Sequence, residues 1–345
     1  MPGSRLVLVL AALFGALVIG TVATFILAEG AAPPDAITDS GDAINQVYWV
    51  LVALAAVIFL LVEVALIAFI IRFRRRRAAQ DLEGPQIHGN TRVEVAWTLV
   101  PALLLLALAI YTFLRVPAVE AKPGDDEDPV EIAVTAHQFY WQYEYPNGAL
   151  SFDVLYLPAG RTAKLVLRSE DVDHSWWVPE LTGKRDAIPG QHNELFFEPR
   201  REGVLETGVC GEFCGIQHAR MTTRVEVVSP AEFERWQEEN AFTDEQASLE
   251  AVGKAEWDAA CAKCHGFEGE GDIGPPIAGS ATLTDQESLR RLLFEGQNLD
   301  TNPGYMPPVG KGWSDRQIRA LIAYVESNET LAGAAEGGGG GVGGG

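Results

Sequence analysis

The cysteine and methionine residues fall into two patterns whose spacing could bind metals. Apart from the initiator Met1, every sulfur atom lies in Cys210-x₃-Cys214-x₃-His218-x₂-Met221, or in Cys261-Ala262-Lys263-Cys264-His265 followed by Met306. Sulfur and imidazole are the donors that soft and borderline metal ions such as copper prefer. The first pattern therefore predicts a copper site. The second, Cys-x-x-Cys-His, is typical of covalent attachment of a c-type haem.

The copper pattern places two thiolates, an imidazole and a thioether within 12 residues. His174, in a segment that we expect to begin a strand, adds a second imidazole from elsewhere. Mononuclear blue-copper sites use one Cys, two His and a weak axial Met, so the second cysteine is a departure. Two thiolates can bridge two copper ions. We favour a metal centre over a disulfide, because a disulfide would not call for His218 and Met221 at those offsets.

The haem pattern also supplies both axial ligands. After Asp244, His265 and Met306 are the His and the Met that the chain offers. A thioether opposite a His raises the potential of the iron. Zinc binding and a dithiol redox pair are the alternatives for Cys261 and Cys264, but the His directly after the second Cys favours haem. With both axial positions filled, we expect electron transfer and not dioxygen binding.

Two long apolar runs indicate a transmembrane helical hairpin over residues 42–116. The runs at 45–71 and 93–114 contain about 27 and 22 residues, enough for a helix to cross roughly 30 Å of hydrocarbon. The arginine-rich stretch 72–77 between them should stay on the cytoplasmic side, which puts both ends of the hairpin outside. Residues 1–30 suit a signal peptide or an extra transmembrane helix, and we favour a cleaved signal.

The chain beyond the hairpin indicates two further domains. From 129 to 230, short strand-like runs separated by Gly and Pro turns favour an antiparallel β-sandwich or barrel. From 244 to 330 the pattern is helical and includes the haem motif. The acidic stretch 122–129 should link membrane and sandwich. The Gly-rich tail, 335–345, is expected to be disordered.

The charge of the chain restricts its partners. The formal net charge is −21, and after Pro117 acidic residues outnumber basic ones by about two to one. Such a surface attracts cationic partners, for example a basic soluble electron carrier, and argues against nucleic-acid binding. It could also simply keep an exported domain soluble.

The hairpin and three segments together resemble cytochrome c oxidase subunit II. The segments are Glu170-Asp-Val-Asp-His-Ser-Trp-Trp-Val-Pro179, Asp186-Ala-Ile-Pro-Gly190 and Cys210-Gly-Glu-Phe-Cys-Gly-Ile-Gln-His-Ala-Arg-Met221. The resemblance covers about residues 40–230. The appended haem domain makes the chain similar to the caa3-type class, in which a cytochrome c is fused to that subunit. The resemblance implies a multi-domain membrane protein with a cupredoxin-like barrel or sandwich and an all-α class I cytochrome c domain.

The resemblance also implies roles for individual residues. It predicts a dinuclear CuA centre with the ligands His174, Cys210, the backbone carbonyl of Glu212, Cys214, His218 and Met221. The Glu212 carboxylate would reach a magnesium ion shared with subunit I. Glu94 would lie at the entrance of a proton path, although an acid at a helix end can also sit harmlessly at the interface.

The aromatic segment from His137 to Tyr145 departs from the family at one position. Phe139 stands where many relatives carry a Trp that contacts external cytochrome c. Tyr140 and Trp141 are candidates for electron transfer, and they fit a barrel core equally well. Asp173 is acidic where an apolar residue is common before the His ligand. It could lower the copper potential if buried, or face water.

The implied function is electron transfer into a terminal oxidase. A soluble donor such as cytochrome c would reduce haem c, CuA would follow, and the haem a of subunit I would pass electrons to haem a3–CuB, where oxygen reduction drives proton pumping. This chain would hold no catalytic residue of its own. Expected partners are subunit I, other oxidase subunits, the donor and the bilayer of the bacterial cytoplasmic membrane, with both metal domains on the periplasmic side.

Three other functions compete with this interpretation. One is a copper-delivery or cupredoxin electron-carrier module, and another is the CuA subunit of a nitric oxide reductase. The absence of βαβ alternation and the presence of Met221 count against copper delivery. A quinol oxidase subunit II is disfavoured because it would lack the copper ligands.

Overall fold

The computed structural model describes residues 32–73, 88–120, 128–298 and 305–333, with the single residues 15, 20 and 86. Most of the segment 1–30, most of the arginine-rich stretch and the tail 335–345 therefore lie outside the described residues. The described chain divides into two compact units. Among the described residues, one unit contains 32–35 and 42–119, and the other contains 36–41 and those from Glu120 onward.

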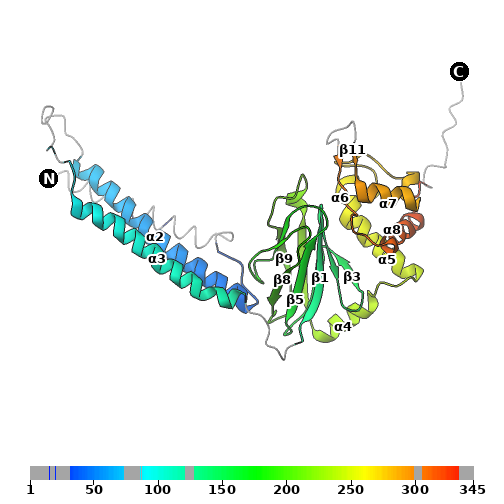
Figure 1. Ribbon diagram of the computed structural model, residues 1–345, viewed down its shortest axis with the longest axis horizontal. Coiled ribbons are helices and arrows are strands. Elements are labelled where there is room, and N and C mark those ends of the chain that lie inside the picture. The colour runs from blue at the N-terminus through cyan, green and yellow to red at the C-terminus, as the bar shows by residue number, and fades with distance from the viewer. Residues whose placement is uncertain are drawn as a thin grey trace, which may run out of the picture. The chain divides into compact units, whose positions relative to one another are not determined.

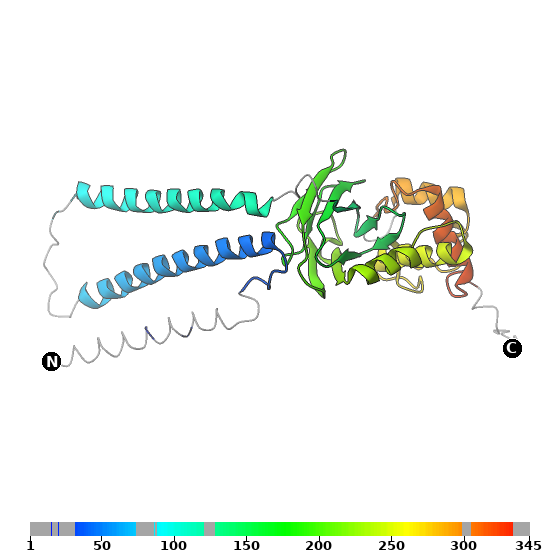
Figure 2. The same cartoon turned by 90° about the horizontal axis from the view of Figure 1, so that it is seen from below.

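The first unit consists of two long helices, α2 (Asp39–Phe73) and α3 (Thr91–Val119), which run in opposite directions (Figures 1 and 2). Within the described residues, these two are the helices long and apolar enough to cross a membrane. Large apolar side chains such as Leu61, Leu105 and Phe113 are exposed along them, as lipid-facing residues must be. Asn90 starts α3, and its backbone N–H donates to the Glu94 carboxylate at 2.9 Å, so Glu94 caps this helix end.

The second unit begins with a β-sandwich of two five-stranded sheets (Figure 1). The strand orders are β3-β2-β1-β5-β8 and β4-β10-β9-β6-β7. The strands are β1 (Val130–His137), β2 (Tyr140–Glu144), β3 (Leu150–Phe152), β4 (Val154–Pro158), β5 (Ala163–Ser169), β6 (His174–Trp177), β7 (Arg185–Ala187), β8 (Asn193–Phe197), β9 (Gly203–Cys210) and β10 (Thr222–Val228).

Two strand pairs correct the expectation of purely antiparallel pairing. Strand β1 pairs with β5 in parallel, and β4 pairs with β10 in parallel. Two parallel strands cannot be joined by a tight turn, because the chain must return to the end of the sheet at which the first strand began. Here the chain returns through the strands that lie between each pair in the sequence, β2 to β4 for the first pair and β5 to β9 for the second. The local pattern of short strands and turns carries no information on these long-range pairings.

The core of the sandwich lies between the two sheets. Burial alternates residue by residue along β5, so that Leu165 and Leu167 point inward, as expected for a strand with one buried face. Leu155 of β4, Trp176 of β6 and Val225 of β10 meet them in one apolar cluster. Cys210, Cys214 and Met221 belong to the same cluster, so the core of the sandwich extends to the copper pattern.

Helix α4 (Pro230–Glu239) follows the sandwich and packs against it, since Phe233 belongs to the sandwich core. The haem-type domain comes next. Its helical elements are α5 (Gln246–Glu256), the π-helical turn η2 (Trp257–Cys261), α6 (Ala262–His265), the 3-10 turn η3 (Ala281–Leu283), α7 (Gln286–Glu295) and α8 (Asp315–Ser327). It also contains the two-residue strands β11 (Gln297–Asn298) and β12 (Tyr305–Met306). The short β11–β12 ladder is a small departure from the all-α expectation.

Helices α5 and α8 cross at close range in this domain (Figure 1). A Cβ at Gly253 would lie only 1.9 Å from the Ala320 carbonyl oxygen, so the crossing requires a glycine. Ser314 caps the start of α8 in a capping box, in which its hydroxyl accepts from the Gln317 backbone N–H and its own backbone N–H donates to Gln317 Oε1. Tyr140 and Phe152 of the sandwich belong to the same apolar cluster as these helices, so sandwich and helices pack as one body.

Candidate copper and haem sites

Strand pairing brings the two halves of the copper pattern together. His174 is the first residue of β6 and Cys210 the last of β9, and these strands pair with Trp176 opposite Cys210. The loop after Cys210 carries Cys214, and the short turn η1 (His218–Arg220) begins at His218. The sheet thus supplies two of the proposed ligand positions, His174 and Cys210, and the loop that follows Cys210 supplies the rest.

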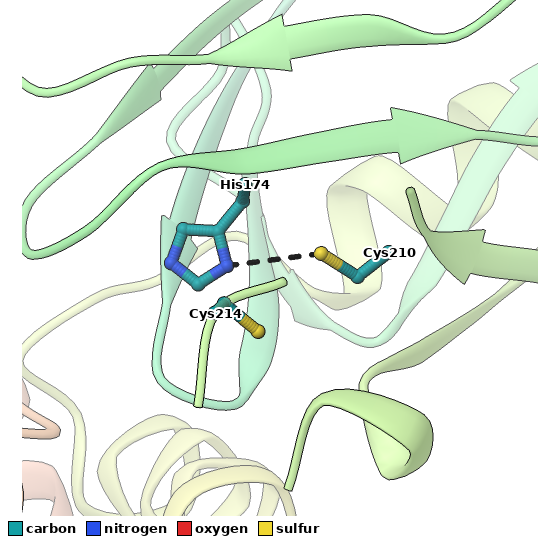
Figure 3. Close-up of side chains that lie close together, drawn as sticks. All are labelled: His174, Cys210 and Cys214. Carbon is teal, nitrogen blue, oxygen red and sulfur yellow. Dashed lines mark hydrogen bonds between the residues drawn. The ribbon is translucent and has the colours of Figure 1, made fainter. Parts of the chain in front are cut away.

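The donor atoms of these residues converge on one buried point. His174 Nδ1 lies 3.9 Å from Cys210 Sγ and 3.2 Å from Met221 Sδ. Cys214 Sγ lies 3.6 Å from His218 Nδ1 and 3.7 Å from Met221 Sδ. The ligand atoms of His174, Cys210 and Cys214 all lie within 4.8 Å of one another. Figure 3 shows the imidazole and the two sulfur atoms around a common space.

These residues fit copper. Both cysteines are free and buried, so their sulfurs remain available to a metal. Two thiolates, two imidazoles and a thioether form the soft donor set that copper prefers. The Glu212 carbonyl oxygen adds a further donor, because it accepts a hydrogen bond from Cys210 Sγ at 3.1 Å. The Glu212 side chain itself is exposed.

A carboxylate that the sequence did not single out orients His174. Asp171 Oδ1 lies 2.8 Å from His174 Nε2, which turns the other ring nitrogen, Nδ1, toward the sulfurs. Asp171 is held in turn by the backbone N–H of Gln138 at 2.6 Å. Such a carboxylate fixes the tautomer and the ring direction of a metal-binding His. Asp173, the acid that drew attention in the sequence, is exposed.

The environment of Cys210 favours a thiolate. Hydrogen bonds from Cys214 and His174 lower the pKa of Cys210, although burial opposes them. The pKa of Cys214 is raised, first by the neighbouring Cys210 sulfur and then by burial, because two thiolates side by side repel each other. Burial lowers the pKa of His174, but the hydrogen bonds that its ring makes to Asp171 and to Cys210 outweigh this, so the net pKa is raised. A bound metal cation would relieve the repulsion between the two sulfurs.

The two candidate electron-transfer aromatics occupy different places. Trp141 is fully buried and lies edge-on to His174, with ring centroids 6.1 Å apart. Tyr140 is fully buried on the opposite side of β2, where its hydroxyl donates to the Val309 carbonyl at 2.8 Å and accepts from Trp313 Nε1 at 2.6 Å. Trp141 thus contacts the copper side, and Tyr140 contacts the helical domain.

The four residues of the haem pattern line a single cavity. Cys261, Cys264, His265 and Met306 all border it. Apolar side chains form much of the remaining wall, including Ile277, Leu283, Leu289, Leu293, Val309 and Leu321. Two thiols, an imidazole and a thioether around an apolar cavity fit a covalently attached haem with His and Met axial ligands.

Local geometry sets the direction of the His265 ring. His265 Nδ1 donates to the Pro275 carbonyl oxygen at 2.7 Å, which leaves Nε2 to bind iron. A Cβ at Gly274 would lie 2.7 Å from this imidazole, so glycine makes room for the ring. Burial raises the pKa of Cys261 to about 12, so this sulfur stays a thiol until it reacts.

Residues of the copper domain reach the haem cavity. Phe139 of the β1–β2 turn and Ile216 of the copper loop both line it. Ile216 lies between Cys214 and His218 in the sequence. Gln217 Nε2 lies 3.9 Å from Cys264 Sγ. The two sites therefore share a wall.

Lys263, inside the haem motif, ties the two domains together. Its Nζ donates to Asp153 Oδ2 at 2.5 Å and to the Phe139 carbonyl at 2.9 Å. Neither Lys263 nor Asp171 was predicted to have a role. Their partners are 110 and 3 residues away. Only Asp171 carries a signal in the sequence, since it lies close before a proposed His ligand.

Family comparisons agree with this arrangement. The periplasmic domain of cytochrome C oxidase subunit II matches residues 151–228, and its transmembrane domain matches residues 30–114. Subunit III of the cbb3-type cytochrome C oxidase matches residues 249–325. Fold, sites and matches define a membrane-anchored electron-transport protein with a periplasmic domain and a cytochrome c domain.

Comparisons with individual proteins identify the family within this class of electron-transport proteins. Cytochrome c oxidase subunit 2 of Alkalihalophilus pseudofirmus is 33% identical over 308 residues, which cover 83% of this chain and 89% of the relative. That of Bacillus subtilis is 32% identical, covering 58% and 60%. The periplasmic domain of subunit II from Bradyrhizobium japonicum is 29% identical, with a TM-score of 0.32, covering 34% of this chain and 95% of that one. The chain belongs to the cytochrome c oxidase subunit II family, with a cytochrome c domain fused at its C-terminal side.

Proposed function

We propose that this chain accepts electrons from a soluble carrier at a haem c and delivers them through a dinuclear copper centre to the catalytic subunit of the oxidase. The observation that carries the proposal is the shared wall between the sites, where Ile216 of the copper loop lines the cavity that Cys264 and His265 border. When bound, the copper ions and the haem supply one-electron chemistry. The protein supplies the ligands, the burial and a fixed distance between the sites.

The proposed copper ligands are His174, Cys210, the Glu212 carbonyl, Cys214, His218 and Met221. The two thiolates would bridge two copper ions, and Asp171 would hold His174 in the binding direction. His174, Cys210, Cys214 and Met221 are buried, so the protein would hold these ligands in place and little rearrangement would accompany electron transfer. The exposed Glu212 carboxylate is free to reach a magnesium ion at the boundary with the catalytic subunit.

The proposed haem attachment uses Cys261 and Cys264, with His265 and Met306 as axial ligands. With both axial positions taken by protein, this iron would exchange electrons and would not bind oxygen. Oxygen reduction would occur in subunit I, at haem a3–CuB, after electrons reach its haem a. Trp141 and Tyr140 are proposed electron-transfer aromatics on the copper side and the haem side of β2.

We further propose that α2 and α3 form a multi-pass anchor in the bacterial cytoplasmic membrane, with both metal domains on the periplasmic side. Glu94 at the start of α3 would lie at the entrance of a proton path into the catalytic subunit, whose proton pumping this chain would support by delivering electrons. The acidic surface suits a basic soluble donor, such as a cytochrome c.

Rapid mixing of the purified oxidase with reduced cytochrome c under anaerobic conditions tests the proposed order. The haem c absorption should change first, and the copper absorption should follow. A double variant, Cys261→Ser with Cys264→Ser, should keep its copper and lose most donor-driven oxygen consumption. Copper reduction at an unchanged rate in this variant would contradict the proposal, because electrons would then bypass the haem.

A further inference from the structure

Glu256, at the end of α5, is a buried carboxyl group without an assigned role. Its side chain is fully buried, and neither carboxylate oxygen accepts a hydrogen bond of ordinary geometry from the described residues, although the Gln317 amide lies close enough to act on it. Burying an ionised carboxylate without a partner costs several kcal/mol, so such groups hold a proton or mark a function. Nothing in the proposed electron path uses this residue.

The described groups that interact electrostatically with Glu256 lie on α8, β2 and η2, and none of them is a cation. Helix α8 places Gln317 beside it, and Gln317 Nε2 donates to Gln142 Oε1 of β2 at 3.3 Å. Tyr140 of β2 and Cys261 of η2 are the titratable groups on which its charge acts.

The cations of the neighbouring helices are engaged elsewhere. Lys254 of α5 pairs with Asp258, and Arg316 and Arg319 of α8 pair with Asp244. His137 stacks on Tyr140 at 4.7 Å in the same buried layer. Burial lowers the pKa of His137 to about 4, so it is neutral and leaves a charge on Glu256 uncompensated.

Glu256 also lies close to the haem cavity. Ala260, about one helical turn or roughly 6 Å further along the chain, lines the cavity, and so does Cys261. All three residues lie in the core of the helical domain, where opposite charges attract far more strongly than in water. A change in the charge of the iron is therefore felt at this carboxyl.

We propose that Glu256 is a redox-linked proton-binding site. When one electron reduces the ferric haem, the Glu256 carboxylate takes up one proton from solvent and becomes a neutral acid. When the electron leaves for copper, the O–H bond breaks and the proton returns to solvent. The inference rests on the proposed function in one respect, which is that haem is bound at Cys261, Cys264 and His265.

The direction of the effect follows from the charges. Burial raises the pKa of Glu256 well above its usual value, and Gln317 lowers it in part. An electron on the iron raises it further, because negative charge nearby favours the protonated form. Between the pKa of the oxidised state and that of the reduced state, the haem potential should fall as pH rises. The limit is about 59 mV for each tenfold decrease in proton concentration.

The test is a spectroelectrochemical titration of haem c in the intact oxidase between about pH 5.5 and pH 9. The wild-type potential should fall with pH, and Glu256→Gln should hold it at the acid value throughout, because Gln is neutral and has nearly the same shape. The matched control is Glu250→Gln on the same helix, where the carboxylate is partly exposed and bonded to Gln246. This variant should keep the wild-type slope.

A second variant keeps the test decisive if Glu256→Gln folds poorly. Gln317→Leu removes the amide that favours the ionised carboxylate, so the pH-dependent region should move to higher pH. A flat wild-type potential, or a slope that survives Glu256→Gln, would overturn the inference. If the chain carried no covalent haem, the proposed function would be overturned as well. The haem absorption spectrum distinguishes this failure from a failure of the Glu256 inference alone.

Discussion

The two cysteine pairs of this chain have different chemistry because of where they lie. Cys210 and Cys214 lie at the end of a strand and in its loop, and their sulfurs face His174 within 4.8 Å. Cys261 and Cys264 lie on a helical segment and border a cavity. Hydrogen bonds lower the pKa of Cys210, whereas burial raises that of Cys261 to about 12.

This difference fits the proposed roles, in which the loop pair would bind metal and the helix pair would anchor a haem covalently. Cys210 favours the thiolate that binds metal, whereas the pKa of Cys214 is raised and this sulfur would lose its proton when a metal cation relieves the repulsion between the two sulfurs. The helix pair stays protonated and apolar, which suits sulfurs that end as thioethers with no charge. Residue type alone does not distinguish the two pairs. The hydrogen bonds around each sulfur do.

The largest effect on oxygen consumption should come from a variant that breaks the cysteine pair of the copper loop and leaves the cysteine pair of the haem motif intact. Cys214→Ser removes a sulfur that we propose as a copper ligand, so the copper centre should be lost and oxygen consumption should fall by more than the roughly 100-fold typical of losing an orienting residue. Haem c should remain attached and reducible. Metal analysis and the haem spectrum measure both sites in one sample. Two coppers per chain in this variant would contradict the ligand assignment.

The next effect concerns the contact between the two domains. Lys263→Met leaves Asp153 without its partner at a site where the two side chains are 20% and 23% exposed. Removing one member of a buried pair costs about 3–5 kcal/mol, and the partial exposure here reduces this to about 2–3 kcal/mol. Denaturant unfolding of the haem-loaded chain measures the loss.

The control for this variant lies on the preceding helix. Lys254→Met removes an exposed pair with Asp258 and should change stability by no more than about 0.5 kcal/mol. Equal losses in the two variants would show that Lys263 does not hold the domains together.

A smaller effect should follow from Asp171→Asn. The amide keeps the shape but weakens the hold on His174, so copper affinity should fall by about 10–100-fold. Asp173→Asn is the matched control, because Asp173 is two residues away and exposed, and it should leave affinity unchanged. Competition with a copper chelator measures both. An effect at Asp173 equal to that at Asp171 would refute the orienting role.

The smallest effect should be a difference in pH response. The folded-state pKa of His174 is raised by Asp171, so as pH falls the ring binds a proton early and competes with copper. Copper affinity should drop by about tenfold per pH unit for each proton involved. The thioether bonds of haem do not titrate, so haem content should stay constant over the same range. If copper and haem were lost together as the pH falls, the proposed difference between the two cysteine pairs would be contradicted.

The features of this molecule that depend only on residues close together in the chain could be predicted from the sequence. The apolar runs indicated the two long helices, and strand-like runs with turns indicated the sandwich. The haem motif is complete within five residues. These features depend on near neighbours in the chain, which is why their pattern is visible without a structure.

Features that depend on distant pairing could not be predicted in this way. The parallel pairs β1–β5 and β4–β10 arise from the path of the chain between sheets. The bond from Lys263 to Asp153 joins residues 110 positions apart. Asp171 was overlooked in favour of Asp173, because the sequence does not show which acid turns toward the imidazole.

The central claim is that two thiolates of one loop hold two coppers beside a haem. Electron paramagnetic resonance of the oxidised, haem-loaded, full-length chain with copper bound tests it most directly. The account predicts hyperfine structure from two equivalent copper ions sharing one unpaired electron, which disappears on reduction. A spectrum from a single copper ion, or no copper signal after loading, would contradict the account.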